Sequence, residues 1–450
     1  MIHTYISDAA KWSGAEHFGQ DAKFSGVEID SRRVSPGSLF VALAGANHDG
    51  HDHIDEAQSR GAAAAFVTRP VPAYLPFLIA EDTVSALGRL ASAWRRRFQL
   101  PVIAVLGSNG KTTVKEMIAA ILRQKEGDAV LATQGNQNNA LGVPLTLFRL
   151  GSQHNVAILE LGANGYGEIG ALGEIAKPDI AVITNAGLDH IAGFGGIEGA
   201  ARANGEVFSA MKGNSIAVLN GDDECLAIWR HQAGQRTQLR FGFNSDVEVL
   251  GNWQPGLVGG DLTIESPWGK IQTRLHLMGS HNAVNALAAA AACLALDIEP
   301  DLISVGLAAA RPVAGRLQSR FCADGACVID DTYNDNPSSL AAALDTLARM
   351  PGKKILLFGD MAELGDEADA WHGWVGQAAH AAGVEELFAV GNLARLAAES
   401  FGEGAHYQTD SGALVRALLP RLRSGVNVLV KGSRCMTMER IVAELLHHKH

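Results

Sequence analysis

The segment "VIAVLGSNGKTTVKEM", residues 102–117, joins an apolar run to an amphipathic helical pattern through a glycine-rich turn. Its two glycines allow backbone N–H groups to point inward without steric cost, and the following helix adds its unpaired N–H groups and positive dipole end. Lys111 would bind the β and γ phosphates, and the Thr112 hydroxyl would ligate Mg²⁺. The segment therefore predicts an α/β fold with a polyphosphate-binding loop that consists of Gly107, Ser108, Asn109, Gly110, Lys111, Thr112 and Thr113.

This loop departs from the pattern G-x-x-x-x-G-K-[ST] at one position, because Val105 stands where the first glycine is expected. The alternative is a glycine-rich turn with a surface lysine and no ligand. The strand before the turn and the helix after it favour the phosphate loop, since the motif requires that context.

The composition limits the class of protein. A chain of 450 residues with 47% apolar and 19% charged residues is typical of a globular enzyme of about three domains. A formal net charge of −11 argues against a surface that binds nucleic acid. The N-terminus lacks a signal-peptide pattern, and no apolar run approaches the roughly 18 residues of a membrane span. The five cysteines lack metal-ligand spacing, so we expect reduced thiols and a cytoplasmic protein without membrane insertion.

Helix and strand patterns divide the chain into three expected domains, residues 1–98, 99–311 and 312–450. The first ends in a helical pattern at 84–98 whose arginines are expected to face solvent. In the second, apolar strands alternate with helices, which predicts a parallel sheet covered on both faces. Residues 246–278 look like an antiparallel extension of that domain. The alternation returns in the third unit, which predicts a smaller nucleotide-type α/β domain.

Polar residues follow the apolar strands of the central unit. Ligands of open parallel sheets bind outside the carboxyl ends of the strands, so the phosphate loop, Glu160 and His190 should share one edge. Glu160 and His190 are therefore candidate Mg²⁺ ligands beside Thr112. The alternatives are a helix-cap or ion-pair carboxylate for Glu160 and a structural histidine for His190.

Two further groups of polar residues are expected at the same site. The loop "GNQNNALGVP", residues 135–144, carries amides that suit sugar hydroxyls, carboxylates or phosphates, although it could be an asparagine-rich loop without a ligand. In the last unit, Asp331, Asp360 and Lys431 end or follow strands at one sheet edge. We expect this edge to face the phosphate loop, with Arg316 able to reach a γ-phosphate.

Taken together, the motifs resemble those of the Mur ligases of peptidoglycan synthesis, over essentially the whole chain. The segments that carry the resemblance are "DSRRVSPGSLFVAL" with "DGHDHIDEA", "GSNGKTTVKEM", "GNQNNALGVPLTL", "ELGANGYGEIG", "ITNAGLDHIAGFGG", "GSHNAVNALAA", "DDTYNDNPSSL", "GDMAELG" and "VKGSRCMTME". The resemblance implies three α/β domains: an N-terminal UDP-binding domain, a central P-loop ATPase domain with a mostly parallel sheet, and a C-terminal Rossmann-like domain that closes over ATP.

The resemblance also implies an activity. ATP would phosphorylate a carboxylate, and an amine would attack the acyl phosphate to give an amide, ADP and phosphate. The motifs are most similar to those of the family members that add D-alanyl-D-alanine to UDP-N-acetylmuramoyl-tripeptide. The expected partners are therefore these two substrates, ATP and Mg²⁺, and the expected state is a monomer.

The family resemblance assigns roles to individual residues. Lys111, Glu160, His190 and Arg316 would be catalytic, and Thr112, Glu160 and His190 would hold metal. ATP would also be held by Asn282, Asn285, Arg316, Asp331 and Asn336, with the two helix asparagines contacting adenine. The substrate residues would be Ser31, Arg32, Asn138, Asn139, Lys431, Ser433 and Arg434.

One position departs from the family pattern. Many Mur ligases carry a carbamylated lysine about fourteen residues after the metal-binding histidine, where this chain has Asn204. A neutral amide is a weaker Mg²⁺ donor than a carboxylate. We therefore expect weaker binding of a second metal and no activation by bicarbonate, unless Asp189 or Glu206 compensates.

Other functions remain to be distinguished. The ligase that adds the third residue of the peptide usually has an Asp-Asn-Pro-Arg signature, whereas here Asp335 to Pro337 is followed by Ser338. A folylpolyglutamate synthase should lack the "DSRRVSPGSLF" domain. A P-loop switch protein would hydrolyse ATP without an acceptor, and a noncatalytic nucleotide-sugar binder would tolerate loss of Lys111.

Overall fold

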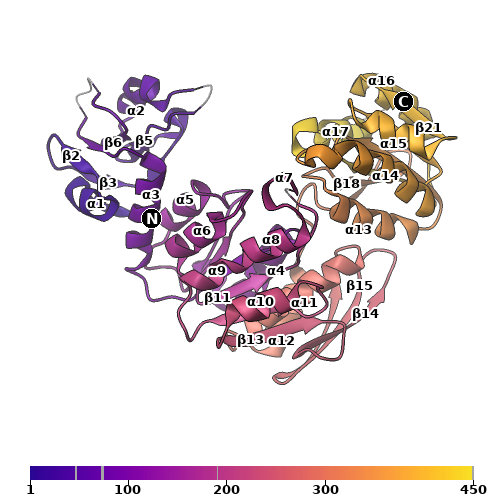
Figure 1. Ribbon diagram of the computed structural model, residues 1–450, viewed down its shortest axis with the longest axis horizontal. Coiled ribbons are helices and arrows are strands. Elements are labelled where there is room, and N and C mark those ends of the chain that lie inside the picture. Colours follow the sequence, from indigo (N-terminus) through magenta and orange to yellow (C-terminus); the bar gives the residue numbers. More distant parts are fainter. Residues whose placement is uncertain (46–47, 72–74, 190, 448–450) are drawn as a thin grey trace.

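The computed structural model describes residues 1–45, 48–71, 75–189 and 191–447, which form three α/β domains in chain order. Figure 1 shows the central domain between the indigo N-terminal domain and the orange to yellow C-terminal domain. The expected three-domain α/β fold is confirmed. In the described part of the chain, no helix is both long and apolar enough to cross a membrane.

The N-terminal domain is built on a small sheet with the strand order β2-β7-β6-β5-β4, in which only β2 runs antiparallel to its neighbour. A separate antiparallel pair joins β1 to β3. The elements are β1 (His3–Tyr5), α1 (Ile6–Ser13), β2 (Glu16–Phe18), β3 (Lys23–Ser25), β4 (Val27–Glu28), β5 (Leu39–Val41), α2 (Ile54–Ser59), β6 (Ala64–Val67), β7 (Phe77–Ile79) and α3 (Thr83–Arg95), with short 3-10 turns at Ser31–Arg33 and Gly50–His53.

Helix α3 corrects one expectation about its arginines. Arg95 does not face solvent but is buried. Its guanidinium donates hydrogen bonds to the carbonyls of Phe98 and Leu100, 2.8 and 3.3 Å away, and lies 3.5 Å from the Asp179 carboxylate. The backbone that leaves α3 has carbonyl groups without helical partners, and the arginine satisfies two of them.

The central domain contains a nine-stranded sheet within the described residues, in the order β16-β15-β14-β13-β12-β11-β8-β10-β9. Strands β9 to β14 pair in parallel and β14, β15 and β16 pair antiparallel, so the predicted parallel sheet and its antiparallel extension are both confirmed. The strands are β8 (Val102–Leu106), β9 (Val130–Ala132), β10 (Val156–Glu160), β11 (Ile180–Ile183), β12 (Ile216–Asn220), β13 (Thr237–Gly242), β14 (Val249–Pro255), β15 (Gly260–Ser266) and β16 (Gly269–Leu275).

Helices cover both faces of this sheet. They are α4 (Lys111–Glu126), α5 (Gly142–Phe148), α6 (Glu168–Ala176), α7 (Ile191–Phe194), α8 (Ile197–Gly205), α9 (Val207–Ala210), α10 (Leu226–Ala233), α11 (Ser280–Leu294) and α12 (Pro300–Ala309), with a 3-10 turn at Gly127–Ala129. Strands β8, β10 and β11 are buried along their whole length. Runs of Val, Ile, Leu and Ala suit such strands because neither face is exposed to water.

The C-terminal domain contains a sheet with the order β17-β18-β22-β19-β20-β21, in which only β17 is antiparallel. Its elements are β17 (Gln318–Phe321), β18 (Cys327–Asp331), α13 (Pro337–Ala348), β19 (Lys353–Gly359), α14 (Ala368–Ala381), β20 (Glu386–Val390), α15 (Ala394–Phe401), β21 (Ala405–Gln408), α16 (Ser411–Leu418), β22 (Val426–Lys431) and α17 (Glu439–His447), with 3-10 turns at Gly365–Glu367, Leu419–Arg421 and Arg434–Met436.

The buried cores show how the domains are joined. One apolar cluster runs from the N-terminal domain into the central domain and includes Leu87 of α3, Leu147 of α5 and Leu172 of α6. By contrast, Met278 is the single central-domain residue in the main core of the C-terminal domain, among the residues described. The C-terminal domain therefore meets the central domain mainly through polar contacts, and these surround the site described next.

Candidate active site

The phosphate loop has a conformation that only glycine adopts easily at two positions. Gly107 has φ +126° and Gly110 has φ +84°. A Cβ atom at Gly107 would lie 2.2 Å from Oγ1 of Thr184, and one at Gly110 would lie 2.3 Å from Oδ1 of Asn285. Both the backbone conformation and the close packing exclude a side chain, so the chain can turn tightly into α4, where the first N–H groups of the helix have no helical partners.

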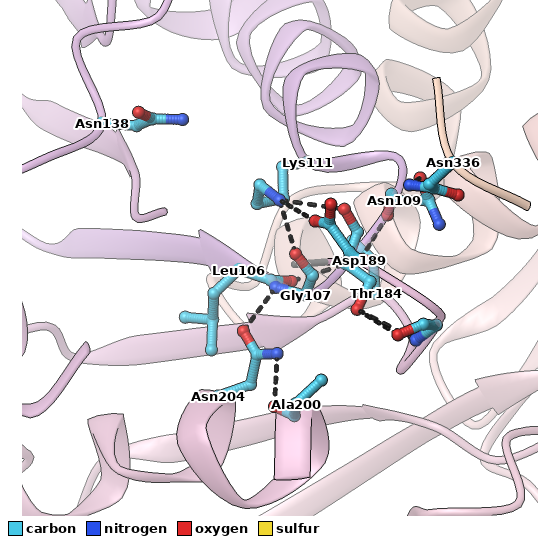
Figure 2. Close-up of polar contacts among 12 residues, drawn as sticks. Leu106, Gly107, Asn109, Lys111, Asn138, Thr184, Asp189, Ala200, Asn204 and Asn336 are labelled. Carbon is cyan, nitrogen blue, oxygen red and sulfur yellow. Dashed lines mark hydrogen bonds and ion pairs between the residues drawn. The ribbon is translucent and has the colours of Figure 1, made fainter. Parts of the chain in front are cut away.

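Lys111 lies folded over this loop. Its Nζ donates hydrogen bonds to the carbonyls of Gly107 and Ser108, at 2.7 and 3.0 Å, and lies 4.0 Å from Oδ2 of Asp189. Figure 2 shows the ammonium group between these three acceptors. Its side chain is 18% exposed, so the ammonium group is partly shielded from water and can approach phosphate oxygens at the loop.

A cavity of about 500 Å³ lies in front of the loop and is lined by both the central and the C-terminal domains. The structure thus brings together most of the residues predicted for ATP binding. The predicted residues that line it are Ser108, Asn109, Gly110, Lys111, Thr113, Asn138, Glu160, Asn282, Asn285, Arg316, Asp331, Asn336 and Lys431.

Glu160 ends β10, pairs in register with Val105 at the carboxyl end of β8, and is 2% exposed. Its Oε1 accepts a hydrogen bond from Nδ2 of Asn138 at 2.8 Å, whereas its Oε2 has no partner among the described residues. A buried carboxylate oxygen without a partner is costly unless a cation binds it. The carboxylate therefore fits a Mg²⁺ ligand beside the phosphate loop.

The other predicted metal ligands are placed less fully. The Thr112 side chain is nearly buried at the start of α4, and His190 lies outside the described residues. No group of three His, Cys, Asp or Glu side chains that could hold a metal occurs in the described part of the chain. The Glu160 carboxylate and the Thr112 hydroxyl still fit Mg²⁺, which often takes one or two protein oxygens and completes its shell with phosphates and water.

Two predicted ATP residues of the C-terminal domain reach the phosphate loop. Nη2 of Arg316 lies 3.5 Å from Oγ1 of Thr112, and Nδ2 of Asn336 donates a hydrogen bond to Oδ1 of Asn109 at 3.0 Å. Figure 2 shows the Asn109–Asn336 contact. Oδ1 of Asn336 also caps α13 by accepting from the Ser339 N–H group. The helix cap therefore fixes an amide that touches the loop.

The two asparagines of α11 lie beside the loop and line the cavity. Nδ2 of Asn282 donates to the Met278 carbonyl at 2.7 Å, and its Oδ1 accepts from Nδ2 of Asn285 at 3.0 Å. Oδ1 of Asn285 faces Gly110. Protein partners thus hold most of these amide groups, and their contact with adenine stays a prediction.

Lys431 lines the cavity, as its place at the sheet edge predicted, and its contact with the dipeptide stays a prediction. Its buried Nζ lies 2.6 Å from Oδ2 of Asp331 and 3.4 Å from Oδ1 of Asp335, in the wall of the cavity. Burial opposes the charged form of the lysine, but the two carboxylates outweigh burial and raise its pKa. Asp335 was not among the predicted site residues, although it lies within the "DDTYNDNPSS" motif.

Burial raises the pKa of Asp335 to about 6, and Lys431 only partly opposes this rise. The folded-state pKa lies above the ordinary value of 3.8. The stability that this group contributes is therefore complete below that ordinary value and is lost as the pH rises through about 6.

We expect the Asp335→Asn variant to remove this pH dependence, which amounts to about 3 kcal/mol of the free energy of unfolding at 1.36 kcal/mol per pKa unit. Denaturant unfolding of the full chain across this pH window measures it. Asp366→Asn, which removes an exposed carboxylate of the same domain, controls for loss of one negative charge. Parallel pH profiles for the wild type and Asp335→Asn would contradict the prediction.

Several predicted substrate residues do not line the cavity. Oγ of Ser31 donates to Glu56 at 2.6 Å, while Arg32 is 77% exposed and pairs with Asp30 in the N-terminal domain. Oδ1 of Asn139 accepts from the N–H groups at the start of α5. Ser433 and Arg434 follow β22, where Ser433 accepts from the Ala362 N–H group and Arg434 lies 3.4 Å from Glu439. Their substrate contacts stay predictions.

Asn204 lies beneath the phosphate loop (Figure 2) and is 7% exposed. Its Oδ1 accepts from the Gly107 N–H group at 2.9 Å, and its Nδ2 donates to the Ala200 carbonyl at 2.8 Å. Of the two residues considered as substitutes, Glu206 binds the N–H groups of Gly167 and Gly170, whereas Asp189 lines the cavity. Asp189 is therefore the better placed to compensate.

We expect Asn204→Lys, assayed with bicarbonate, to lower the Mg²⁺ concentration that gives half the maximal rate. The wild type should show no activation by bicarbonate. Asn204→Ala is the matched control, because it breaks the bond to Gly107 without adding a metal ligand and should cost about 1–3 kcal/mol of stability. An unchanged Mg²⁺ dependence in Asn204→Lys would show that position 204 does not act on the metal.

Family models match three successive parts of the chain. They are described as "Mur ligase family, catalytic domain" over residues 23–95, "Mur ligase middle domain" over residues 105–293, and "Mur ligase, glutamate ligase domain" over residues 315–434. A relative from Escherichia coli, UDP-N-acetylmuramoyl-tripeptide--D-alanyl-D-alanine ligase, is 40% identical over 449 residues, which cover 99% of each chain.

Solved structures agree with this similarity. A crystal structure of MurF from Acinetobacter baumannii has a TM-score of 0.93 and 31% identity, with full coverage of both chains. MurF ligase from Thermotoga maritima in complex with ADP has a TM-score of 0.84 and 29% identity, over 94% of this chain and 97% of that one. The chain is similar over its full length to a relative with 40% identity, and three domain models of one family match it. The chain therefore belongs to the Mur ligase family.

Proposed function

We propose that this protein is the ATP-dependent ligase that joins D-alanyl-D-alanine to UDP-N-acetylmuramoyl-tripeptide in peptidoglycan synthesis. The products are UDP-N-acetylmuramoyl-pentapeptide, ADP and phosphate. The observation that carries the proposal is the cavity between the phosphate loop and the C-terminal domain, which is lined by Glu160, whose buried Oε2 has no partner among the described residues. Full-length similarity to the Escherichia coli enzyme supports the choice of substrates.

The residues around the cavity suit the formation of an acyl phosphate. A substrate carboxylate and ATP are both anionic, and Lys111 and Arg316, which both line the cavity, would offset their repulsion. Glu160, Thr112 and His190 would hold Mg²⁺, which supplies further positive charge at the phosphates. Because the C-terminal domain forms one wall of the cavity, its closure would exclude the water that hydrolyses an acyl phosphate.

The proposal extends to the domains and the state of the protein. Residues 1–98 would bind the UDP end of the substrate, with Ser31 and Arg32 at the uridine nucleotide. Residues 99–311 would bind ATP, and residues 312–450 would close over it from a hinge near Gly315. We propose a monomer that acts in the cytoplasm, where its nucleotide substrates are made.

Phosphate release from Mg·ATP tests the function. The purified protein is assayed with UDP-N-acetylmuramoyl-tripeptide alone, with D-alanyl-D-alanine alone, and with both. We expect release only with both, and one pentapeptide product per phosphate. Release without either acceptor would favour a P-loop switch protein. Release with a diamino acid and UDP-N-acetylmuramoyl-dipeptide would favour the ligase that adds the third residue.

A further inference from the structure

Tyr333, in the loop between β18 and α13, forms an aromatic wall of the cavity. The Cζ atom of Arg316 lies 3.9 Å from the centroid of its ring, and the Cζ atom of Arg434 lies 5.9 Å from the same centroid. Both distances are within the range of a cation–π interaction, and that of Arg316 is a close stack. The ring therefore lies beside one cation at the phosphate loop and near a second at the edge of the C-terminal domain.

The backbone of Tyr333 also contacts the segment that carries Arg316. Its N–H group donates to the Gly315 carbonyl at 3.1 Å. Gly315 has φ +71°, and a Cβ atom there would lie 3.1 Å from the Tyr333 nitrogen and 3.2 Å from its Cβ. Glycine suits this close approach because it has no side chain. The hydrogen bond from Tyr333 to Gly315 therefore holds the backbone next to Arg316 against the Tyr333 segment.

The stacking leaves the edge of the guanidinium available. Nη2 of Arg316 points to Oγ1 of Thr112 at 3.5 Å, and its buried Nε has no partner among the described residues. An aromatic ring contacts the face of a guanidinium and uses none of its N–H donors, which lie in the plane. The negative potential of the ring face also offsets the repulsion between the Arg316 guanidinium and the nearby Lys431 ammonium group.

We propose that Tyr333 is a positioning residue, whose ring holds Arg316 with its N–H edge directed at the terminal phosphate of ATP. This proposal rests on the proposed function, because it assigns Arg316 to the γ-phosphate. It concerns the ring and not the hydroxyl group, since the contacts of the described residues include no hydrogen bond of the Tyr333 hydroxyl. The ring would hold the donors of Arg316 oriented before ATP arrives, which lowers the ordering that binding requires.

Two variants at position 333 separate the ring from the bulk of the side chain. Tyr333→Phe keeps the aromatic face, and we expect its kcat to stay within about 2-fold of the wild type. Tyr333→Leu keeps apolar volume but removes the π face, and we expect kcat to fall about 10-fold. The same Tyr333→Leu change in an Arg316→Ala background should have less than about a 2-fold further effect, because the ring acts through that arginine.

Binding measurements keep this test apart from the ligase assay. By calorimetry, Tyr333→Leu should weaken binding of a non-hydrolysable ATP analogue about 10-fold and leave ADP binding unchanged, since only the former carries a γ-phosphate. Thermal unfolding of each variant shows whether it is folded. Equal losses in Tyr333→Phe and Tyr333→Leu, or an undiminished loss in the Arg316→Ala background, would overturn the proposal. A wild type that makes no amide would instead overturn the proposed function, while the calorimetry would still test Tyr333.

Discussion

Replacing Lys111 with alanine is expected to lower kcat for amide formation more than about 10²-fold, the scale seen when one charge-stabilising group is removed from a site. The ammonium group donates to the loop carbonyls, and Lys111 lines the cavity in which phosphates would bind. Negative charge increases on the phosphoryl and leaving oxygens during transfer, so the loss should affect kcat more than KM for the UDP substrate. Steady-state kinetics with both acceptor substrates measures this.

Lys125→Ala is the matched control for this variant. It removes the same charge from the same helix, but at the exposed far end of α4. We expect its rate to stay close to that of the wild type. A Lys111→Ala variant that kept the wild-type rate would show that this ammonium group does not stabilise the reacting phosphate, whereas a wild type without turnover would favour a noncatalytic nucleotide-sugar binder.

The sequence predicted the arrangement of the central domain well because local patterns determine it. Uniformly apolar strands such as β8 and β10 occur where both faces of a sheet are covered. Parallel pairing then places their carboxyl ends together, and the register of Glu160 with Val105 confirms the predicted common edge for Glu160 and the phosphate loop. The glycines at 107 and 110 predicted a tight connection between strand and helix. Both have positive φ angles and closely packed surroundings in the structure.

Side-chain partners that are distant in sequence could not be predicted in this way. Lys431 and Asp331 are 100 positions apart, and their pairing depends on β18 and β22 being neighbours in the sheet. No local pattern indicated that these two strands are neighbours, so the ion pair was not predicted. Likewise, Asn204 was compared only with the metal-binding lysine of the family, because nothing nearby in sequence indicates that its amide accepts from Gly107.

The uses of asparagine side chains also depend on the tertiary structure. Asn138 and Asn139 are adjacent and chemically identical, yet the first donates to Glu160 in the cavity and the second caps a helix outside it. Asparagine serves both local backbone groups and ligands. Which asparagine meets Glu160 depends on how the loop packs against β10, and this packing is a feature of the tertiary structure.

Glu160→Gln is expected to lower kcat more than about 10²-fold and to raise the Mg²⁺ concentration that gives half the maximal rate. The amide has nearly the shape of the carboxylate, and its oxygen could still accept from Asn138, which donates to Oε1 at 2.8 Å in the wild type. Its NH₂ group would replace Oε2, which has no partner among the described residues. An N–H donor cannot ligate a cation, so the change removes the metal contact while it preserves packing.

Calorimetry of ATP with and without Mg²⁺ distinguishes a metal ligand from a structural carboxylate at position 160. In the wild type, Mg²⁺ should strengthen ATP binding, whereas in Glu160→Gln this gain should be lost and metal-free ATP should bind as before. Glu224→Gln, at an exposed position of the same domain, controls for the lost negative charge. If Glu160→Gln kept the full Mg²⁺ effect, the unpartnered oxygen would not be a metal ligand, and the positive charge for phosphoryl transfer would have to come from Lys111 and Arg316 alone.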